Sequence, residues 1–308
     1  MPDKVSIVNR NAQTITLSAE IYRPATFDPT ARHAVIVVVH PGGGVKEQTA
    51  GLYASRLAEQ GLVAITFDAS YQGESTGEPR HLENPYVRTE DISAVVDYLV
   101  GQPWVDVERI GGMGVCAGGG YVANAAINDR RLKAIATVSA VNIGSMFRNG
   151  WDNSVASIDA MPVLVAGAHA RTTEATGGAT ITIPLAPVRR EDAPDKEMED
   201  AWEYYRTPRC VHPNAPSLAT ARSLSQLVTY DAYNMADVFL TQPLQIVVGS
   251  EAGSKWMSDD LFARAASADK HAHVVKGANH MALYDVPQYV DEAVGVLTEF
   301  FRRRLQAQ

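Results

Sequence analysis

The sequence predicts an α/β fold in which a mainly parallel β-sheet has helices on both faces and is interrupted by one insert. Strand-like and helix-like segments alternate over residues 13–141, a pattern typical of right-handed βαβ units. The alternation stops over residues 142–240 and resumes over 241–308. We therefore expect one core built from residues 1–141 and 241–308, with residues 142–240 forming an inserted, mostly helical cap.

The first half gives its elements in a clear order. An alternating segment (QTITLSAEIY, 13–22) predicts an extended strand, and two Val/Ile-rich runs at 34–40 and 62–68 predict strands buried on both faces. The other expected elements are helices at 46–60 (ended by Gly61), 89–102 (capped by Thr89) and 118–129, and strands at 109–116 and 132–141.

The insert is harder to interpret. It mixes polar helical patterns with turn-rich pieces, and PVLVAGAHA (162–170) fits either a strand or a buried helix. After it we expect strands at 243–250 and 271–277, a helix around 258–267 and an amphipathic helix over 286–305.

Composition excludes several classes of function. With 27 basic and 35 acidic residues the net charge is −8, which disfavours general binding to nucleic acid or to an anionic membrane. The N-terminus has no secretory h-region, and no apolar run is long enough to cross a bilayer. Two cysteines, Cys116 and Cys210, are too few for a disulfide framework or a four-ligand zinc site. We expect a cytoplasmic protein with a small-molecule substrate and neither metal nor cofactor, and a homodimer is the assembly to test.

Residues 114–120 (GVCAGGG) carry the main functional signal. A nucleophile at a sharp strand-to-helix turn needs small residues two positions before and after it, and Gly114 and Gly118 meet that need around Cys116. The turn would expose the sulfur at the carboxyl edge of the sheet, at a helix N-terminus that favours thiolate. Cys116 is therefore the candidate nucleophile, and Cys210 is expected to be a passive thiol.

Two other interpretations compete for this segment. Cys116 also fits a buried core cysteine among packing glycines. In addition, Gly112-x-Gly114-x-x-Ala117 satisfies the dinucleotide fingerprint, although the following strand does not end in the acidic residue that this fingerprint requires.

A nucleophile of this kind needs a base, an acid and donors for an oxyanion. In α/β-hydrolases the order along the chain is nucleophile, acid, histidine, and His280 lies in a loop after a late strand. Glu251 is the first carboxylate after the 243–250 strand and is the candidate for orienting His280. The oxyanion donors expected are the backbone N–H groups of Ala117 and of Gly42 or Gly43 in the HPGGG loop.

Taken together, five segments resemble the α/β-hydrolase superfamily, and specifically its dienelactone-hydrolase-like branch, in which cysteine commonly replaces serine. The segments are HPGGGVKEQTAGLYASRLAEQG, FDASYQGESTGEPR, GVCAGGGY, GSEAG and GANHMALYD. The resemblance implies an eight-stranded sheet and a triad of Cys116, Glu251 and His280. Many relatives have aspartate as the acid, so glutamate departs from the pattern.

The expected reaction is hydrolysis of an activated ester, lactone or thioester through a thioester on Cys116. Alternatives are an acyltransferase or cyclase that uses the same elbow, a nucleotide-binding oxidoreductase, and a catalytically silent binding protein. Arginines of the insert are expected either to bind a substrate carboxylate or to form surface ion pairs. The candidate substrate-binding residues are Tyr71, Arg80, Tyr204, Arg206 and Arg209.

Overall fold

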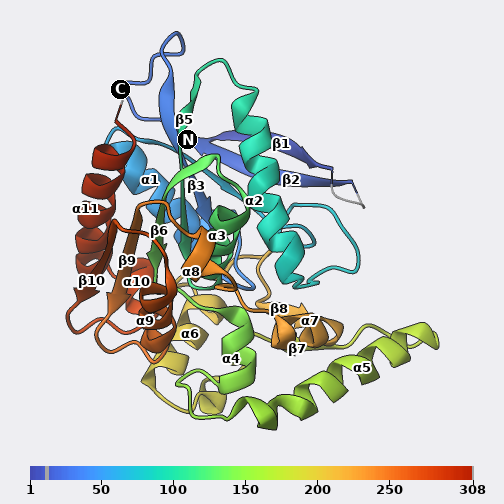
Figure 1. The fold of residues 1–308 in the computed structure, drawn as a ribbon. Helices are drawn as coiled ribbons and strands as arrows, with labels where there is room; N and C mark the ends of the chain where they lie inside the picture. The colour runs from blue at the N-terminus through green and yellow to red at the C-terminus, as the bar shows by residue number, and fades with distance from the viewer. Residues whose placement is uncertain (11–13, 307–308) are drawn as a thin grey trace.

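An eight-stranded β-sheet runs through the centre of the protein (Figure 1). The computed structural model describes residues 1–10 and 14–306, so residue 13 of the first expected strand lies outside the described part. The strand order is β1-β2-β4-β3-β5-β6-β9-β10, with β1–β2 and β2–β4 antiparallel and the other neighbours parallel. The strands are β1 (Asp3–Asn9), β2 (Ile15–Tyr22), β3 (His33–Val39), β4 (Val63–Phe67), β5 (Val105–Val115), β6 (Leu132–Val138), β9 (Leu244–Gly249) and β10 (Lys270–Val275). The predicted mainly parallel sheet is confirmed, and β1 is an additional edge strand that the sequence reading did not include.

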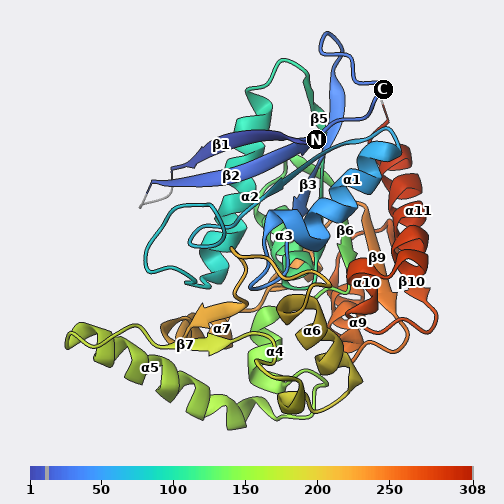
Figure 2. The same cartoon turned by 180° about the vertical axis from the view of Figure 1, so that it is seen from behind.

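Helices cover both faces of this sheet (Figures 1 and 2). On one face lie α2 (Pro85–Val100), α3 (Ala117–Asn128) and α9 (Lys255–Arg264), and on the other lie α1 (Gly51–Glu59), α10 (Ala282–Asp285) and α11 (Pro287–Arg304).

Two helix boundaries differ from the expectation. Helix α2 begins at Pro85, because the Asn84 side chain accepts hydrogen bonds from the next free backbone amides, so Thr89 lies inside the helix instead of capping it. The helix expected over 46–60 is divided at Gln48 (φ −79°, ψ −136°), giving a π-helical turn over Lys46–Ala50 and then α1.

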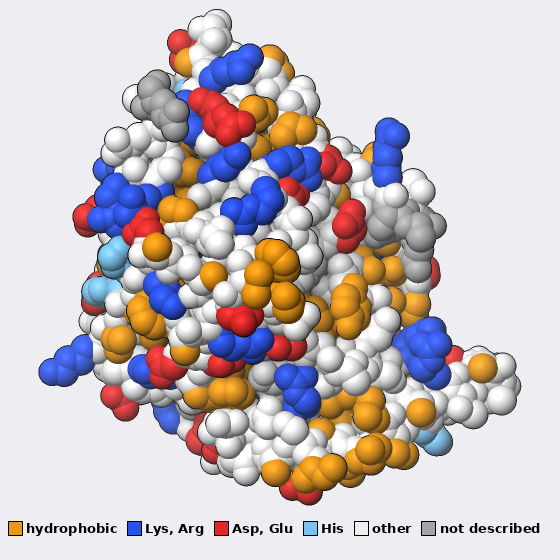
Figure 3. Space-filling model, in the orientation of Figure 1, with side chains coloured by type: hydrophobic (Ala, Val, Ile, Leu, Met, Phe, Trp, Pro, Cys, Tyr) orange, Lys and Arg blue, Asp and Glu red, His pale blue; other side chains and the backbone are white. Residues whose placement is uncertain are grey.

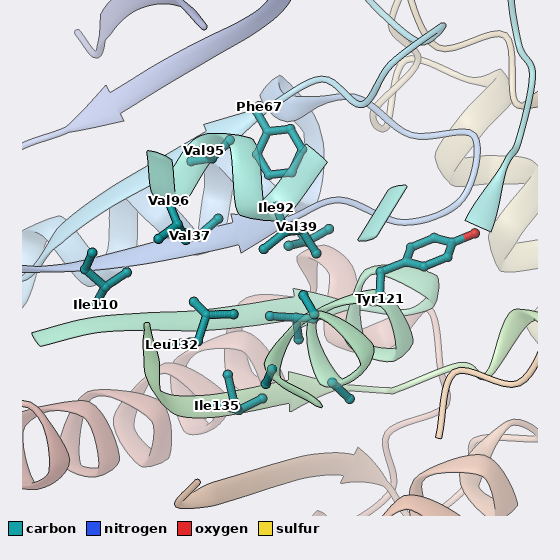
Figure 4. Packing of buried hydrophobic residues seen from close by; sticks show 14 of the residues in the cluster. Val37, Val39, Phe67, Ile92, Val95, Val96, Ile110, Tyr121, Leu132 and Ile135 are labelled. Atoms are coloured by element: carbon teal, nitrogen blue, oxygen red, sulfur yellow. The ribbon is translucent and has the colours of Figure 1, made fainter. Parts of the chain in front are cut away.

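The core consists of two hydrophobic clusters, one on each face of the sheet. Successive side chains of a strand point to opposite faces, so Val35, Val37 and Val39 of β3 enter one cluster and Ile36 and Val38 enter the other. Figure 4 shows the first cluster, where Val37 and Val39 pack against residues of α2 such as Ile92 and Val96. This burial on both faces explains why the central strands are continuous Val/Ile runs.

The segment between β6 and β9, residues 142–240, is mostly helical, and we propose that it acts as the cap. Residues 162–170 lie in helix α5, which is largely exposed and extends away from the rest of the molecule (Figure 1). The elements of the segment are α4 (Ile143–Asn149), α5 (Met161–Ala175), β7 (Thr182–Pro184), α6 (Lys196–Arg206), β8 (Leu218–Thr220), α7 (Leu224–Thr229) and α8 (Ala236–Phe239), with short 3-10 turns at Ser157–Ala160, Arg190–Asp192 and Ala221–Ser223.

The surface carries mixed charge. On the face shown in Figure 3, basic and acidic side chains are interspersed, and hydrophobic side chains gather along the lower edge near α5. Exposed apolar residues of that region include Ile158, Met161 and Val165.

Within residues 1–10 and 14–306, no helix combines the length and apolar character that spanning a membrane requires.

Candidate active site

Cys116 stands at the sharp turn between β5 and α3. Its backbone has φ 57° and ψ −125°, a conformation that a non-glycine residue adopts at a cost of about 1–3 kcal/mol. The turn requires glycine at both Gly114 and Gly118, as predicted. A Cβ on Gly114 would lie 2.0 Å from the carbonyl oxygen of Gly118, and one on Gly118 would lie 2.3 Å from that of Val39. The elbow therefore depends on one contact within the turn and one with the end of β3, and both glycines leave these contacts free of side chains.

The half-buried sulfur of Cys116 faces a cavity of about 200 Å³. The backbone amides of Ala117 and Gly42 both hydrogen-bond to Cys116, and both residues line the cavity. Gly43 does not line the cavity, and its amide is not among the hydrogen-bond donors to Cys116. Of the two glycines expected as oxyanion donors, the structure therefore brings only Gly42 to the sulfur.

His40 fixes the loop that carries Gly42. It is fully buried, its Nδ1 donates to the carbonyl of Pro41 (2.7 Å), and its Nε2 accepts from the amide of Ala69 (3.1 Å). Burial holds the pKa of His40 well below its usual range, so the ring is neutral, as these two bonds require. The buried Arg88 guanidinium donates to the carbonyl of His40 (2.8 Å) from the other side. His40 therefore positions the donor loop, a role that the sequence reading did not assign.

His280 lies in the loop after β10, and its ring is buried beside the cavity. Burial lowers the pKa of His280 to about 3. Its Nδ1 lies 2.6 Å from the hydroxyl of Ser254, and its Nε2 lies 3.3 Å from the hydroxyl of Tyr284. The edge of the Trp151 indole packs against the imidazole, with ring centroids 4.7 Å apart. The structure thus brings His280 to the same cavity as Cys116.

Burial also controls the charge of the thiol. It raises the pKa of Cys116, although hydrogen bonds from Tyr284 and from the amides of Ala117 and Gly42 act in the opposite direction. With the pKa of the thiol raised and that of His280 lowered, both groups are neutral in the resting protein. A preformed thiolate–imidazolium pair is therefore disfavoured.

Glu251 does not reach His280, which corrects the predicted assignment of the acid. Its side chain is exposed and accepts a hydrogen bond from the neighbouring Ser250 hydroxyl (3.0 Å). The buried Ser254, three residues later in the same loop, occupies the position at Nδ1. Periodicity and chain order locate the loop after β9 correctly, but they do not determine which of its side chains turns inward.

A different glutamate, Glu197 of α6, supports the histidine loop from the insert. Its carboxylate accepts hydrogen bonds from the amide of His280 (2.7 Å), from the amide of Gly253 (3.2 Å) and from the indole N–H of Trp151. Glu197 is buried, and burial raises its pKa. All three partners are N–H donors, so only the ionised carboxylate satisfies them. Nothing in the sequence pattern of the insert distinguishes Glu197 from its acidic neighbours.

None of the five predicted substrate-binding residues lines the cavity, so these assignments are corrected. Tyr71 is buried in the core cluster, and the Tyr204 hydroxyl accepts from the amide of Thr49 (2.9 Å). The guanidinium of Arg80 donates to carbonyls of its own loop, and that of Arg206 donates to carbonyls of the insert. Arg209 forms a two-point ion pair with Asp285 (2.6 and 2.8 Å). The cavity receives apolar side chains from the insert instead: Ile143, Met146, Trp151, Leu185, Met198 and Tyr205.

The glycines of the dinucleotide fingerprint do not form an open phosphate loop. Gly112 lies inside β5, where a Cβ would come within 2.6 Å of Val122 on α3, so its role is close helix–strand packing.

One acidic cluster within the described residues has the spacing of a metal site: Glu47, Asp68 and Glu74. The ammonium of the buried Lys46 lies within 2.6–2.9 Å of all three carboxylates, so a lysine already occupies the centre of the cluster. The cluster is therefore an ion-pair network that anchors the turn at Lys46.

Comparison with known proteins agrees with the fold. Residues 30–287 match the family described as serine aminopeptidase, S33. The chain is 63% identical over 305 residues, 99% of its own length and 100% of the relative's, to the uncharacterized protein YcjY of Escherichia coli. The crystal structure of the hypothetical protein PA2218 from Pseudomonas aeruginosa superimposes with a TM-score of 0.87 at 32% identity, covering 99% of this chain and 94% of that one. A shorter match, 33% identical over 108 residues (35% of this chain and 34% of the other), is to the thiohydrolase aneE of Aspergillus aculeatus.

Proposed function

Since the chain belongs to the α/β-hydrolase family described as serine aminopeptidase, S33, we propose that it hydrolyses activated ester-type bonds with Cys116 as its nucleophile. One observation carries the proposal. The sulfur of Cys116 stands at a strained elbow, receives two backbone N–H groups, and shares a mainly apolar cavity with the His280 imidazole. A cysteine held only for packing would need neither the strained backbone nor the converging donors.

In the proposed mechanism His280 takes the thiol proton as the sulfur attacks the substrate carbonyl, because both groups start neutral. The amides of Ala117 and Gly42 then stabilise the oxyanion of the tetrahedral adduct. His280 returns the proton to the leaving group, a thioester remains on Cys116, and water activated by His280 releases the acid. Ser254 at Nδ1 fixes the orientation of the ring.

Two properties of the site limit the substrate. A thiolate leaves a tetrahedral adduct easily, so substrates with activated carbonyls, such as thioesters, lactones and enol esters, should react better than ordinary amides. The cavity has no Lys, Arg, Asp or Glu among its described lining residues, and its volume is below the roughly 300–1,000 Å³ of pockets for drug-sized ligands. We therefore propose a short, uncharged acyl group, in place of the carboxylate-bearing substrate expected from the arginines.

The test compares short-chain acyl thioesters and p-nitrophenyl esters as substrates of the wild type, Cys116→Ala and the matched control Cys210→Ala. We expect loss of turnover in Cys116→Ala alone, with an acyl mass increment mapping to Cys116 when turnover of the wild type is quenched with acid. Undiminished turnover in Cys116→Ala would remove Cys116 from this role. Analysis of the released product identifies the acceptor: a free acid means hydrolysis, whereas a new ester or amide means acyl transfer.

A further inference from the structure

The hydroxyl of Tyr284 lies between the two groups that must exchange a proton. It is 3.3 Å from Nε2 of His280 and hydrogen-bonds to the thiol of Cys116. In the part of the chain that the structure describes, no hydrogen bond joins the thiol directly to the imidazole. We propose that Tyr284 is a catalytic residue that carries the thiol proton of Cys116 to His280. This inference rests on the proposed function, because only a nucleophilic Cys116 has to lose its proton.

The hydrogen bonds around the imidazole allow the arrangement of protons that the transfer needs. Nδ1 of His280 carries the ring proton and donates to the Ser254 hydroxyl at 2.6 Å. Nε2 is then an acceptor. The Tyr284 hydroxyl donates to the sulfur in the resting site, and rotation of this hydroxyl toward Nε2 leaves its oxygen free to accept from the thiol of Cys116. Thiol, hydroxyl and imidazole thus form a single chain of donors and acceptors.

The transfer step is balanced without any further reactant. The S–H bond of Cys116 breaks as an O–H bond forms on Tyr284, while the original O–H bond of Tyr284 breaks and an N–H bond forms at Nε2 of His280. The electron pair left on sulfur forms the bond to the substrate carbonyl carbon. Tyr284 is a neutral phenol before and after the step, and it ends with its new proton directed at the sulfur.

Tyr284 is fixed well enough to serve in this way. Its side chain is buried, with 2% of its surface exposed, and its ring packs edge-on against that of Tyr204 at 5.1 Å. Its carbonyl accepts from the hydroxyl of Thr49 (3.0 Å), and the preceding carbonyl of Leu283 accepts from the hydroxyl of Tyr53 (2.8 Å). Helix α10 is therefore held at both backbone and side chain, and the hydroxyl has little freedom to leave its place.

The variant that tests the inference is Tyr284→Phe, which removes only the hydroxyl. We expect kcat/KM for an acyl thioester to fall about 100-fold, within the range attributed to positioned acid–base groups. The matched control is Tyr53→Phe, which removes a buried hydroxyl from the same helix contact but touches neither sulfur nor imidazole. We expect the control to keep kcat/KM within about threefold of wild type once thermal unfolding shows that both variants are folded.

A proton inventory of the acylation step in H₂O–D₂O mixtures gives a readout that a structural role would not move. If two protons move in the transition state, the acylation rate constant of the wild type depends on the deuterium fraction of the solvent along a curve. The slower Tyr284→Phe enzyme should give a straight line. A straight line for the wild type would overturn the relay even if the variant failed to fold. Near-normal kcat/KM in folded Tyr284→Phe would overturn it while leaving the proposed function intact, provided that Cys116→Ala is inactive. An active Cys116→Ala would instead refute the proposed function and the relay together.

Discussion

Replacing Glu197 by glutamine should damage both the stability and the activity of the protein, although Glu197 does not touch the cavity sulfur. Its two carboxylate oxygens accept from the amide of His280, the amide of Gly253 and the indole of Trp151. A glutamine side chain has one acceptor oxygen and one NH₂ group. Whichever way it turns, an N–H of the variant faces either the His280 amide or the indole N–H.

The size of the effect follows from that mismatch. Leaving one buried donor unsatisfied costs about 1–3 kcal/mol. In a chain of 308 residues this corresponds to a decrease in Tm of roughly 2–6 °C, since about 1 kcal/mol shifts the Tm of a large domain by about 2 °C. Because the affected amide belongs to His280, we also expect kcat to fall about tenfold, equivalent to about 1.4 kcal/mol of lost positioning.

Thermal unfolding and turnover of a short acyl thioester measure the two effects. The matched control is Glu203→Gln on the same helix, where the carboxylate is more exposed and its nearest cation, Arg209, is 3.7 Å away. If Glu197→Gln and Glu203→Gln unfold within 1 °C of each other and turn over substrate equally fast, Glu197 does not hold the His280 loop in place.

Three further outcomes are expected. Gly118→Ala should abolish soluble expression or lower stability by about 3 kcal/mol or more, because its Cβ would lie 2.3 Å from the Val39 oxygen; normal urea unfolding of this variant would contradict the elbow geometry. Ser254→Ala should lower kcat/KM about tenfold with little change in KM, because Nδ1 of His280 loses its partner; a rise in KM alone would point to substrate binding instead. The pKa of His280 in the folded protein (about 3) is below the unfolded value of about 6.5, so the stabilisation it provides is complete above pH 6.5 and is lost as the pH falls. Between about pH 6.5 and 5 the unfolding free energy of the wild type should therefore drop by up to about 1.4 kcal/mol per pH unit more than that of His280→Gln, and equal slopes in urea titrations would refute the buried neutral imidazole.

The features predicted correctly from the sequence are those whose signal lies within one short segment. The elbow at Cys116 has a local signal, because a Cβ on Gly114 would meet the backbone of Gly118, and the spacing of these two glycines was enough to predict the turn. The buried central strands could also be predicted, because a strand that is buried on both faces is a continuous run of apolar residues such as Val and Ile. The family match agrees with the α/β-hydrolase resemblance, whereas the dienelactone-hydrolase-like branch stays a prediction.

The failures came from contacts between distant segments. Which side chain of the loop after β9 reaches His280 depends on how that loop folds, and Ser254 turns inward where Glu251 was expected. Arg209 contacts Asp285, 76 residues away, and this partner decides that it forms an ion pair and does not bind substrate. The start of α2 was missed despite a local signal, since Asn84 followed by Pro85 is a good N-terminal pair, and so was β1, where Val5 and Ile7 alternate with polar residues.

The hydroxyl of Ser254 behind the imidazole has a consequence for the durability of the enzyme. Without a carboxylate at that position, nothing pulls His280 toward the charged form, and Cys116 keeps its hydrogen until an acyl donor arrives. Hydrogen peroxide and similar oxidants react with the deprotonated sulfur. Cys116 should therefore form sulfenic acid more slowly than a cysteine that is held as a thiolate. The protein would thus remain competent through oxidative stress that silences cysteine enzymes with a permanently ionised sulfur.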